Sequence, residues 1–173
     1  MIAQFRLLLA ALLLAFGAAP AFAQVKLTFW GHERDENYPH AFITMEGRSG
    51  GRQVSEATGF TARRITPRVL FGPVDGMLER PSRGYMRRAT TYPAFSIMLD
   101  DAGYARVRAH IQRWRALAQP SYDLNRRNCV HFVLEAAAAV GLRVNRDTPH
   151  TQSPRQFLDE LRRLNPQVTP ERR

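Results

Sequence analysis

The sequence predicts an α+β domain in which an antiparallel sheet packs against helices. Between residues 25 and 60, polar and apolar residues alternate in several short segments, and a glycine-rich turn signal separates two of them. From Asp100 onward, apolar residues instead recur at three- and four-residue steps, as in amphipathic helices. Because strands come first and helices follow, we expect the sheet to pair mainly through hairpins.

Residues 1–23 predict a secretory signal peptide. A single Arg near the start precedes an apolar run, and Ala21-Phe22-Ala23 matches the small-x-small pattern of a cleavage site. The apolar core is short for a membrane span. We therefore expect a bacterial exported protein, periplasmic or secreted, whose mature chain begins near Gln24 and forms one domain over residues 24–173.

The expected strands are short and bounded by turn signals. They cover residues 25–32, 40–47, 52–60, a piece near 69–71, and 94–99. The turn between the second and third is Arg48-Ser49-Gly50-Gly51, which is typical of a hairpin. Residues 61–90 are rich in Pro, Gly and Arg, so irregular connections are expected around the short strand.

Three helices are expected in the second half. They run from Asp100 or Asp101 to about Ala118, from Asn128 or Cys129 to Val140, and from Ser153-Pro154 through Leu164. The first presents one apolar stripe, formed by Val107, Ile111, Trp114 and Leu117. Pro120 follows the first helix as a stop, and Gly141 caps the second. The tail from Asn165 is expected to be frayed.

The charge of the chain favours anionic partners. Lys and Arg number 25 against 15 acidic residues, giving a formal charge of +10, and the predicted leader removes a single Arg from this count. Cell-wall polymers, anionic envelope surfaces and acidic substrates are the expected partners. Nucleic acid is not expected, because no recognition motif appears and export removes the usual target. The sequence predicts no cofactor and carries no signature of an oligomeric state.

Cys129 is the only cysteine, so no internal disulfide is possible. Its expected place is the start of a helix, where the helix dipole stabilises a thiolate and backbone N–H groups can bind an oxyanion. A histidine on a facing strand would complete a nucleophile–base pair, and His40 opens an expected strand. The structural alternative is a small, inert residue of the core.

The stretch "NCVHFV", residues 128–133, resembles the Asn-Cys-x-His-Phe-Val signature of lecithin:retinol acyltransferase-like proteins. These form a circularly permuted branch of the NlpC-type papain-like fold. In that branch the catalytic His opens an early strand and the Cys lies far downstream at a helix start, the order of His40 and Cys129 here. The resemblance extends from about His40 to Gly141. It implies the permuted fold, with Cys129 as nucleophile and His40 as its acid–base partner.

One departure from the family concerns the third catalytic residue. Such proteins place a further polar residue, often a second His, on the strand after the first His, and residues 52–60 contain no His. If the hairpin turns about Gly50, Thr58 is the first candidate and Glu56 the second. A register slip of one residue would put Ala57 there instead.

The remaining histidines are predicted to lie outside the catalytic site. His131 follows Cys129 by two residues, so on a helix it points away from the thiol and is expected to be buried. His32 lies among acidic residues without recognised metal-ligand spacing, which favours a solvated loop over a metal site. His110 lies among arginines and is expected at the surface. No metal site is predicted.

Together these features predict an exported cysteine-dependent hydrolase or acyltransferase. It would act on an amide or ester through an acyl-enzyme on Cys129, with peptidoglycan peptides as the first expected substrate and lipid acyl chains as the second. The alternative is a catalytically weak or inactive module that binds an anionic envelope polymer or membrane surface. A reactive thiol beside His40 separates the two, since a binding module would tolerate the loss of Cys129.

Overall fold

The computed structural model describes residues 24–33 and 38–171. The predicted signal peptide lies outside this part of the chain. The elements in order are β1 Gln24–His32, β2 His40–Ser49, β3 Arg52–Ala62, η1 Pro67–Leu70, β4 Gly76–Glu79, α2 Arg83–Met86, β5 Thr91–Leu99, α3 Asp101–Arg115, α4 Cys129–Ala139, α5 Pro154–Leu164 and β6 Thr169–Pro170. The predicted α+β class is confirmed. No helix among these residues is long and apolar enough to span a membrane.

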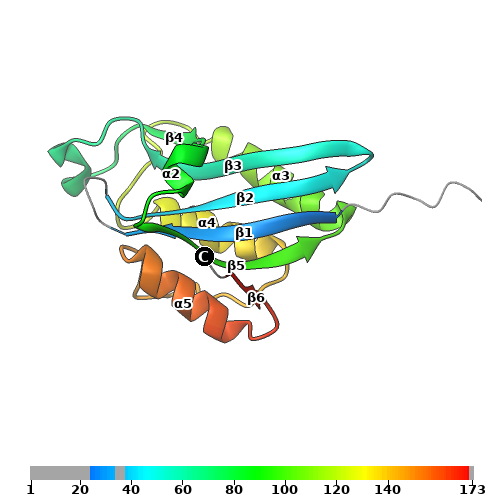
Figure 1. Ribbon diagram of the computed structural model, residues 1–173. Helices are drawn as coiled ribbons and strands as arrows, with labels where there is room; N and C mark the ends of the chain where they lie inside the picture. Colours follow the sequence, from blue (N-terminus) through cyan, green and yellow to red (C-terminus); the bar gives the residue numbers. More distant parts are fainter. Residues whose placement is uncertain (1–23, 34–37, 172–173) are drawn as a thin grey trace, which may run out of the picture.

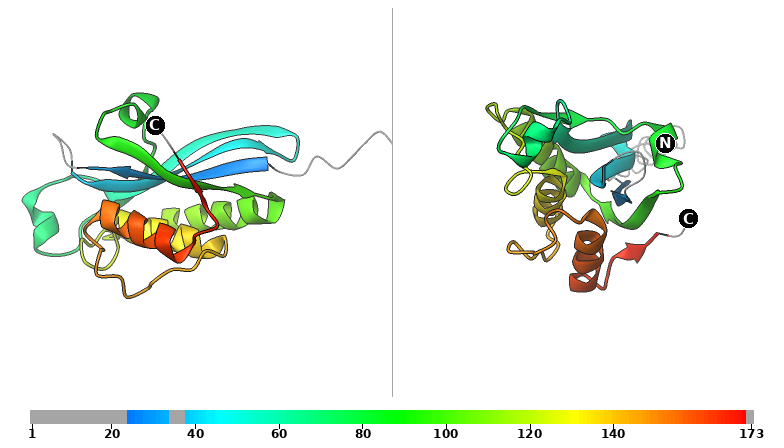
Figure 2. Two further views of the ribbon diagram at one scale, coloured as in Figure 1. Left: turned by 60° about the horizontal axis from the view of Figure 1, so that its bottom comes forward. Right: turned by 90° about the vertical axis from the view of Figure 1, so that its left-hand side faces the viewer.

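The described strands form one antiparallel sheet in the order β4-β3-β2-β1-β5-β6 (Figure 1). β2 and β3 form the expected hairpin, closed by Gly50 and Gly51, whose φ angles of 53° and 75° favour glycine. β5 returns to pair with β1, so the first strand lies inside the sheet. Figure 2 shows α3, α4 and α5 on one face, with the short α2 on the other.

The core fills the space between the sheet and the three longer helices. Phe29 and Phe95 stack on neighbouring strands, with ring centroids 4.7 Å apart. Trp114 of α3 packs edge-on against Phe60 of β3 and Phe132 of α4. Val107, Ile111 and Trp114 of the predicted apolar stripe are therefore buried in this core. α3 ends at Arg115, three residues before the expected end, so Leu117 lies beyond the helix and is only partly buried.

The structure corrects two expectations about the strands. The short strand expected near 69–71 is absent; residues 67–70 instead form the 3₁₀ helix η1, with Pro67 at its start, where a fixed φ suits a helical turn. The strand of this region is β4, which pairs with β3 from Gly76 to Glu79. The tail is also not simply frayed, because Thr169 and Pro170 pair with the outer edge of β5.

Two histidines expected in contact with solvent are buried. His32 ends β1, with Nδ1 2.8 Å from the Thr91 hydroxyl, so the solvated-loop interpretation is wrong. His110 on α3 is fully enclosed, and its ring packs against Trp114 and Phe132. In both cases a neighbouring element covers a position that looks polar in the sequence.

A candidate cysteine–histidine–carboxylate site

Cys129 is the first residue of α4, as expected, and its side chain is largely buried. The helix begins here because Asn128 caps it. The Asn128 side-chain oxygen accepts hydrogen bonds from the N–H groups of Val130 at 2.8 Å and His131 at 3.3 Å. The cap thus fixes the backbone on both sides of the thiol.

Asn128 is itself held from two directions. Its amide nitrogen donates to the carbonyl oxygens of Leu124 and Thr151, each at 2.7 Å. His131 completes a capping box, with Nδ1 3.3 Å from the backbone nitrogen of Asn128. His131 therefore orders the helix start and takes no place beside the thiol. This agrees with its predicted structural role, although its side chain is only partly buried.

His40 is the first residue of β2 and is largely buried. Its imidazole pairs with the Glu79 carboxylate, and the Cys129 thiol lies near enough to raise the pKa of the ring. Nε2 pairs with Oε1 of Glu79. This leaves Nδ1 as the ring nitrogen available to Cys129. The structure thus brings together the two residues that the sequence singled out and adds a carboxylate.

The electrostatics of this cluster favour the protonated imidazole. Burial lowers the pKa of His40, but hydrogen bonding and charge interaction with Cys129 and then Glu79 outweigh burial and raise it to about 10. Burial also acts to raise the pKa of the Glu79 carboxyl, yet the His40 interaction leaves it below its ordinary value. At neutral pH the site therefore holds an imidazolium next to a carboxylate.

Glu79 reaches His40 because of strand register. It lies directly opposite Gly59 on β3, which in turn lies opposite Phe42 on β2, two residues from His40. Because Gly59 has no side chain, the His40 ring and the Glu79 carboxylate have room to meet beside it. A Cβ there would lie 2.6 Å from His40 Nε2 and 3.1 Å from Glu79 Oε1. Glycine is thus required at position 59 because the side chains of His40 and Glu79 lie too close to the backbone there to admit a Cβ.

The structure does not bring either predicted orienting residue to His40. Thr58 lies opposite Ile43, and side chains three residues apart on β2 point to opposite faces, so Thr58 and His40 lie on different faces. Glu56 is engaged elsewhere, in an ion pair with Arg108 of α3, with the atoms 2.5 Å apart. The expected pairing of β2 with β3 is wrong, because the observed register puts Gly59, and not Thr58, beside His40.

The sequence carried only a weak signal for Glu79. The residue belongs to the segment expected to be irregular, and its strand is four residues long. Gly76-Met77-Leu78-Glu79 does end on a carboxylate, and only Asp75 and Glu79 are acidic within residues 61–90. Only the β3–β4 pairing identifies Glu79 as a partner of His40, and the sequence pattern did not predict this pairing.

The hydrogen-bond donors near the thiol are fewer than a bare helix start would offer. Asn128 occupies the N–H groups of Val130 and His131, and the N–H of Phe132 donates to the Asn128 carbonyl. These bonds do not use the N–H of Cys129, which also lies in the first turn of α4. Tyr122 supplies a second candidate, because burial and the nearby Cys129 charge raise the pKa of its phenol and keep it protonated.

The fold and the site together define an α+β protein with a cysteine, a histidine and a carboxylate clustered where a helix begins. Among the described residues, no group of three or more His, Cys, Asp or Glu is placed to hold a metal ion. Comparisons with models of protein families, with curated proteins and with solved structures found no match. The function is therefore inferred from the chemistry of the chain itself.

Proposed function

We propose that this protein is an exported cysteine-dependent hydrolase or acyltransferase of permuted papain-like fold. The observation that carries the proposal is the interaction of His40 with both Cys129 and Glu79. A nucleophile, an acid–base group and an orienting carboxylate clustered together form the arrangement that covalent acyl transfer requires. The likeness of residues 128–133 to the acyltransferase-like signature adds support from the sequence.

In the first half of the reaction, the Cys129 thiolate attacks the carbonyl carbon of an amide or ester. The carbonyl π electrons move to oxygen, and the Cys129 N–H donates a hydrogen bond to this oxyanion, with Tyr122 as the candidate second donor. The oxyanion collapses, the bond to the leaving amine or alcohol breaks, and the His40 imidazolium protonates that group. A thioester on Cys129 and a neutral His40 remain.

In the second half, neutral His40 removes a proton from the incoming nucleophile, which attacks the thioester carbonyl carbon and forms a second oxyanion; this oxyanion collapses as the bond to sulfur breaks. Water gives hydrolysis, while an amine or alcohol gives acyl transfer. The thiolate leaves, and His40 is again the imidazolium. Glu79 holds Nε2 throughout, which orients Nδ1 toward the sulfur and stabilises the charged ring.

Peptidoglycan peptides are the substrates we propose first. Export would place the protein beside the cell wall, and enzymes of the related non-permuted branch cut cell-wall peptides, which is an argument by analogy. The test is incubation with isolated muropeptides, with product masses determined. Phospholipid vesicles serve as the second substrate set, because acyl chains of lipids are the other substrate the resemblance implies.

The catalytic proposal is tested by trapping the acyl-enzyme. An activated ester such as a p-nitrophenyl ester is mixed with the folded protein, and the intact mass is measured over time. We expect a single acyl adduct on Cys129 that is absent in Cys129→Ala and forms or decays slowly in His40→Ala. Met98→Ala, a change to an exposed residue of β5, is the control. Labelling that requires unfolding would overturn the proposal.

A further inference from the structure

The connection from β3 to β4, residues 63–75, exposes three large apolar side chains. Ile65, Leu70 and Phe71 are 52, 67 and 86% exposed, and they account for half of the large exposed hydrophobic side chains among the described residues. Soluble proteins rarely concentrate such side chains on one short segment unless it meets a partner. We call this segment the β3–β4 loop.

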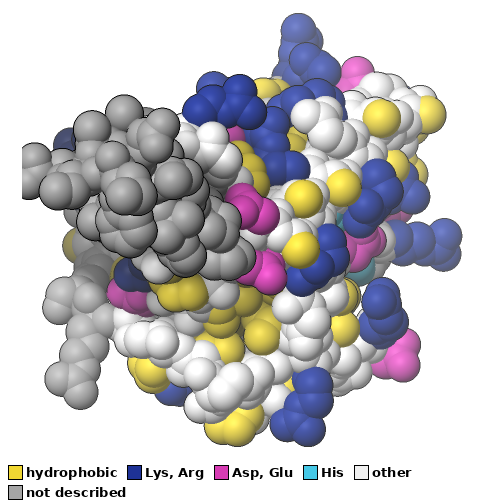
Figure 3. Space-filling view, turned by 90° about the vertical axis from the view of Figure 1, so that its right-hand side faces the viewer, with side chains coloured by type: hydrophobic (Ala, Val, Ile, Leu, Met, Phe, Trp, Pro, Cys, Tyr) yellow, Lys and Arg dark blue, Asp and Glu magenta, His cyan; other side chains and the backbone are white. Residues whose placement is uncertain are grey.

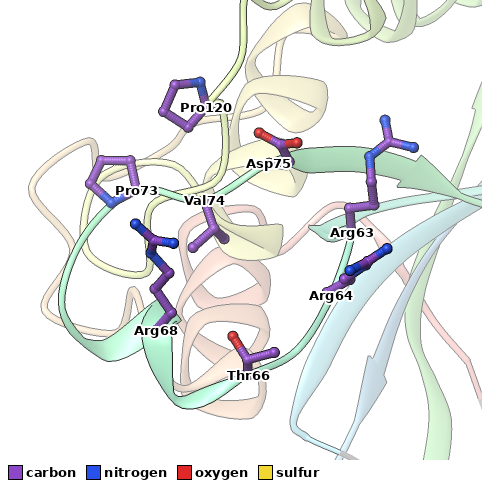
Figure 4. A pocket seen from close by; sticks show the side chains of 8 residues that line it. All are labelled: Arg63, Arg64, Thr66, Arg68, Pro73, Val74, Asp75 and Pro120. Carbon is purple, nitrogen blue, oxygen red and sulfur yellow. The ribbon is translucent and has the colours of Figure 1, made fainter.

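The same loop carries three exposed arginines. Arg63, Arg64 and Arg68 line a pocket of about 590 Å³, together with Thr66, Pro73, Val74, Asp75 and Pro120. Figure 4 shows Arg63 and Arg64 at the end of β3 and Arg68 on η1, with Asp75 as the one carboxylate of the lining. No ion pair or side-chain hydrogen bond joins these guanidinium groups to the described residues. They are therefore available to an external anion.

The loop is anchored at its base and projects at its tip. Val74 and Tyr122 exchange two backbone hydrogen bonds of 2.9 Å, and the Arg63 N–H donates to the carbonyl of Asp75 at 2.7 Å. Figure 1 shows the loop extending beyond the end of the sheet at which β3 ends and β4 begins. The exposed side chains of Leu70 and Phe71 thus lie on a loop whose base is held by backbone hydrogen bonds.

We propose that the β3–β4 loop docks the protein on a bilayer containing anionic phospholipid. Leu70, Phe71 and Ile65 enter the interfacial region, where an apolar side chain is removed from water. The arginine pocket accepts the phosphate of a lipid headgroup, which suits the planar donors of guanidinium. This inference goes beyond the proposed chemistry and does not depend on Cys129.

Positive charge by itself does not select this surface. The opposite end of the molecule also bears Lys and Arg, spread among apolar and acidic side chains (Figure 3). On α3, Arg106 bonds the Ala139 carbonyl and Arg108 pairs with Glu56, so these cations are engaged within the fold. The β3–β4 loop is distinguished because unengaged arginines and strongly exposed apolar side chains occur within ten residues of each other.

The test is flotation with vesicles, using a chain that begins at Gln24 and carries Cys129→Ala. This chain contains every described helix and strand, lacks the apolar leader and cannot turn over lipid through the thiol. Vesicles of phosphatidylcholine are compared with vesicles of phosphatidylcholine and phosphatidylglycerol. We expect binding only to the second kind, and weaker binding as salt increases.

Two double variants test the apolar side chains and the arginines of the β3–β4 loop separately. Leu70→Ser with Phe71→Ser removes the apolar tip, and Arg64→Gln with Arg68→Gln removes two cations from the pocket. Each is expected to weaken vesicle binding about tenfold or more. All these side chains are exposed, so circular dichroism should be unchanged. The controls are Met98→Ser, an exposed apolar residue of β5, and Arg162→Gln with Arg163→Gln on α5, and both should bind as the parent does.

Several outcomes would overturn the proposal. Equal losses in the α5 control would mean that dispersed charge drives adsorption. Failure of the parent chain to bind anionic vesicles would exclude docking outright. Binding of inorganic phosphate that depends on Arg64 and Arg68, without vesicle binding, would identify a site for a soluble phosphate instead.

Discussion

The carboxylate of Glu79 on β4 pairs with Nε2 of His40 on β2, and the intervening strand allows this contact only because it carries Gly59. The position of the His40 imidazole thus depends on β2, β3 and β4 together. Because Glu79 takes Nε2, Nδ1 is the ring nitrogen left to act on Cys129, which lies near the ring at the start of α4. Each of the following predictions depends on a particular contact in this arrangement or in the packing around it.

Replacing Glu79 by Gln should impair catalysis without unfolding the protein. The amide keeps the shape but removes the negative charge that helps to raise the pKa of His40, so that pKa should fall from about 10. We expect a drop of about tenfold to a thousandfold in kcat, with circular dichroism unchanged. An NMR titration of the His40 ring reads out the pKa. Glu56→Gln, which alters the Arg108 pair instead, should leave that titration in place.

Gly59→Ala should separate His40 from Glu79 by steric pressure. The new Cβ would lie 2.6 Å from His40 Nε2, so the ring must move. We expect slower alkylation of Cys129 by iodoacetamide or a changed pH profile of that reaction. The matched control is Gly84→Ala on α2, where the nearest atom would be the Ser82 hydroxyl at 3.6 Å, an ordinary contact. Unaltered Cys129 reactivity in Gly59→Ala would refute the close approach.

Stability should decrease as pH rises above the ordinary range of histidine. The His40 pKa is about 10 in the folded protein and 6.5 when unperturbed. The stabilisation from the charged ring is therefore complete below pH 6.5 and is lost as pH rises to 10, because the unfolded chain releases its proton first. Urea unfolding between pH 6 and 10 should show this slope. His40→Gln should flatten it, whereas His150→Gln should not.

His110 should give the opposite dependence on the acidic side. Burial, with Arg113 nearby, lowers the pKa of its ring to about 4. Stability is present above pH 6.5 and falls as pH decreases toward 4, since the unfolded chain takes up a proton that the folded chain resists. The loss should be at most about 3 kcal/mol. His110→Phe keeps an aromatic ring against Trp114 and should remove this dependence in unfolding measured from pH 7 to 4.

Asn128→Ala should destabilise the protein and disorder the start of α4. The substitution removes the cap of Val130 and His131 and leaves two partly buried carbonyls without their donor. We expect a loss of about 1–3 kcal/mol in the free energy of unfolding. Ser82→Ala, which removes the cap of the short, partly exposed α2, should cost less. Equal losses would mean that Asn128 acts only as a local cap.

The sequence by itself determined the main elements of the fold. Alternation predicted β1, β2, β3 and β5, and the Gly50-Gly51 signal predicted the hairpin that joins the second and third. Apolar periodicity and capping residues predicted α3, α4 and α5. These patterns are local, because strand alternation, helix caps and glycine turns arise from interactions within a few residues. The placement of Cys129 at a helix start followed from the same local logic.

Only the tertiary structure decided which groups meet. A hairpin count favours Thr58 as the partner of His40, but the observed register turns Thr58 to the other face and puts Gly59 beside His40. Glu79 became a partner through β4, a strand too short to give a pattern of its own. The sequence predicts His110 at the surface, but Trp114 and Phe132 pack against its ring and bury it. Register and packing depend on contacts between distant segments, and a one-residue difference changes the face of every side chain on a strand.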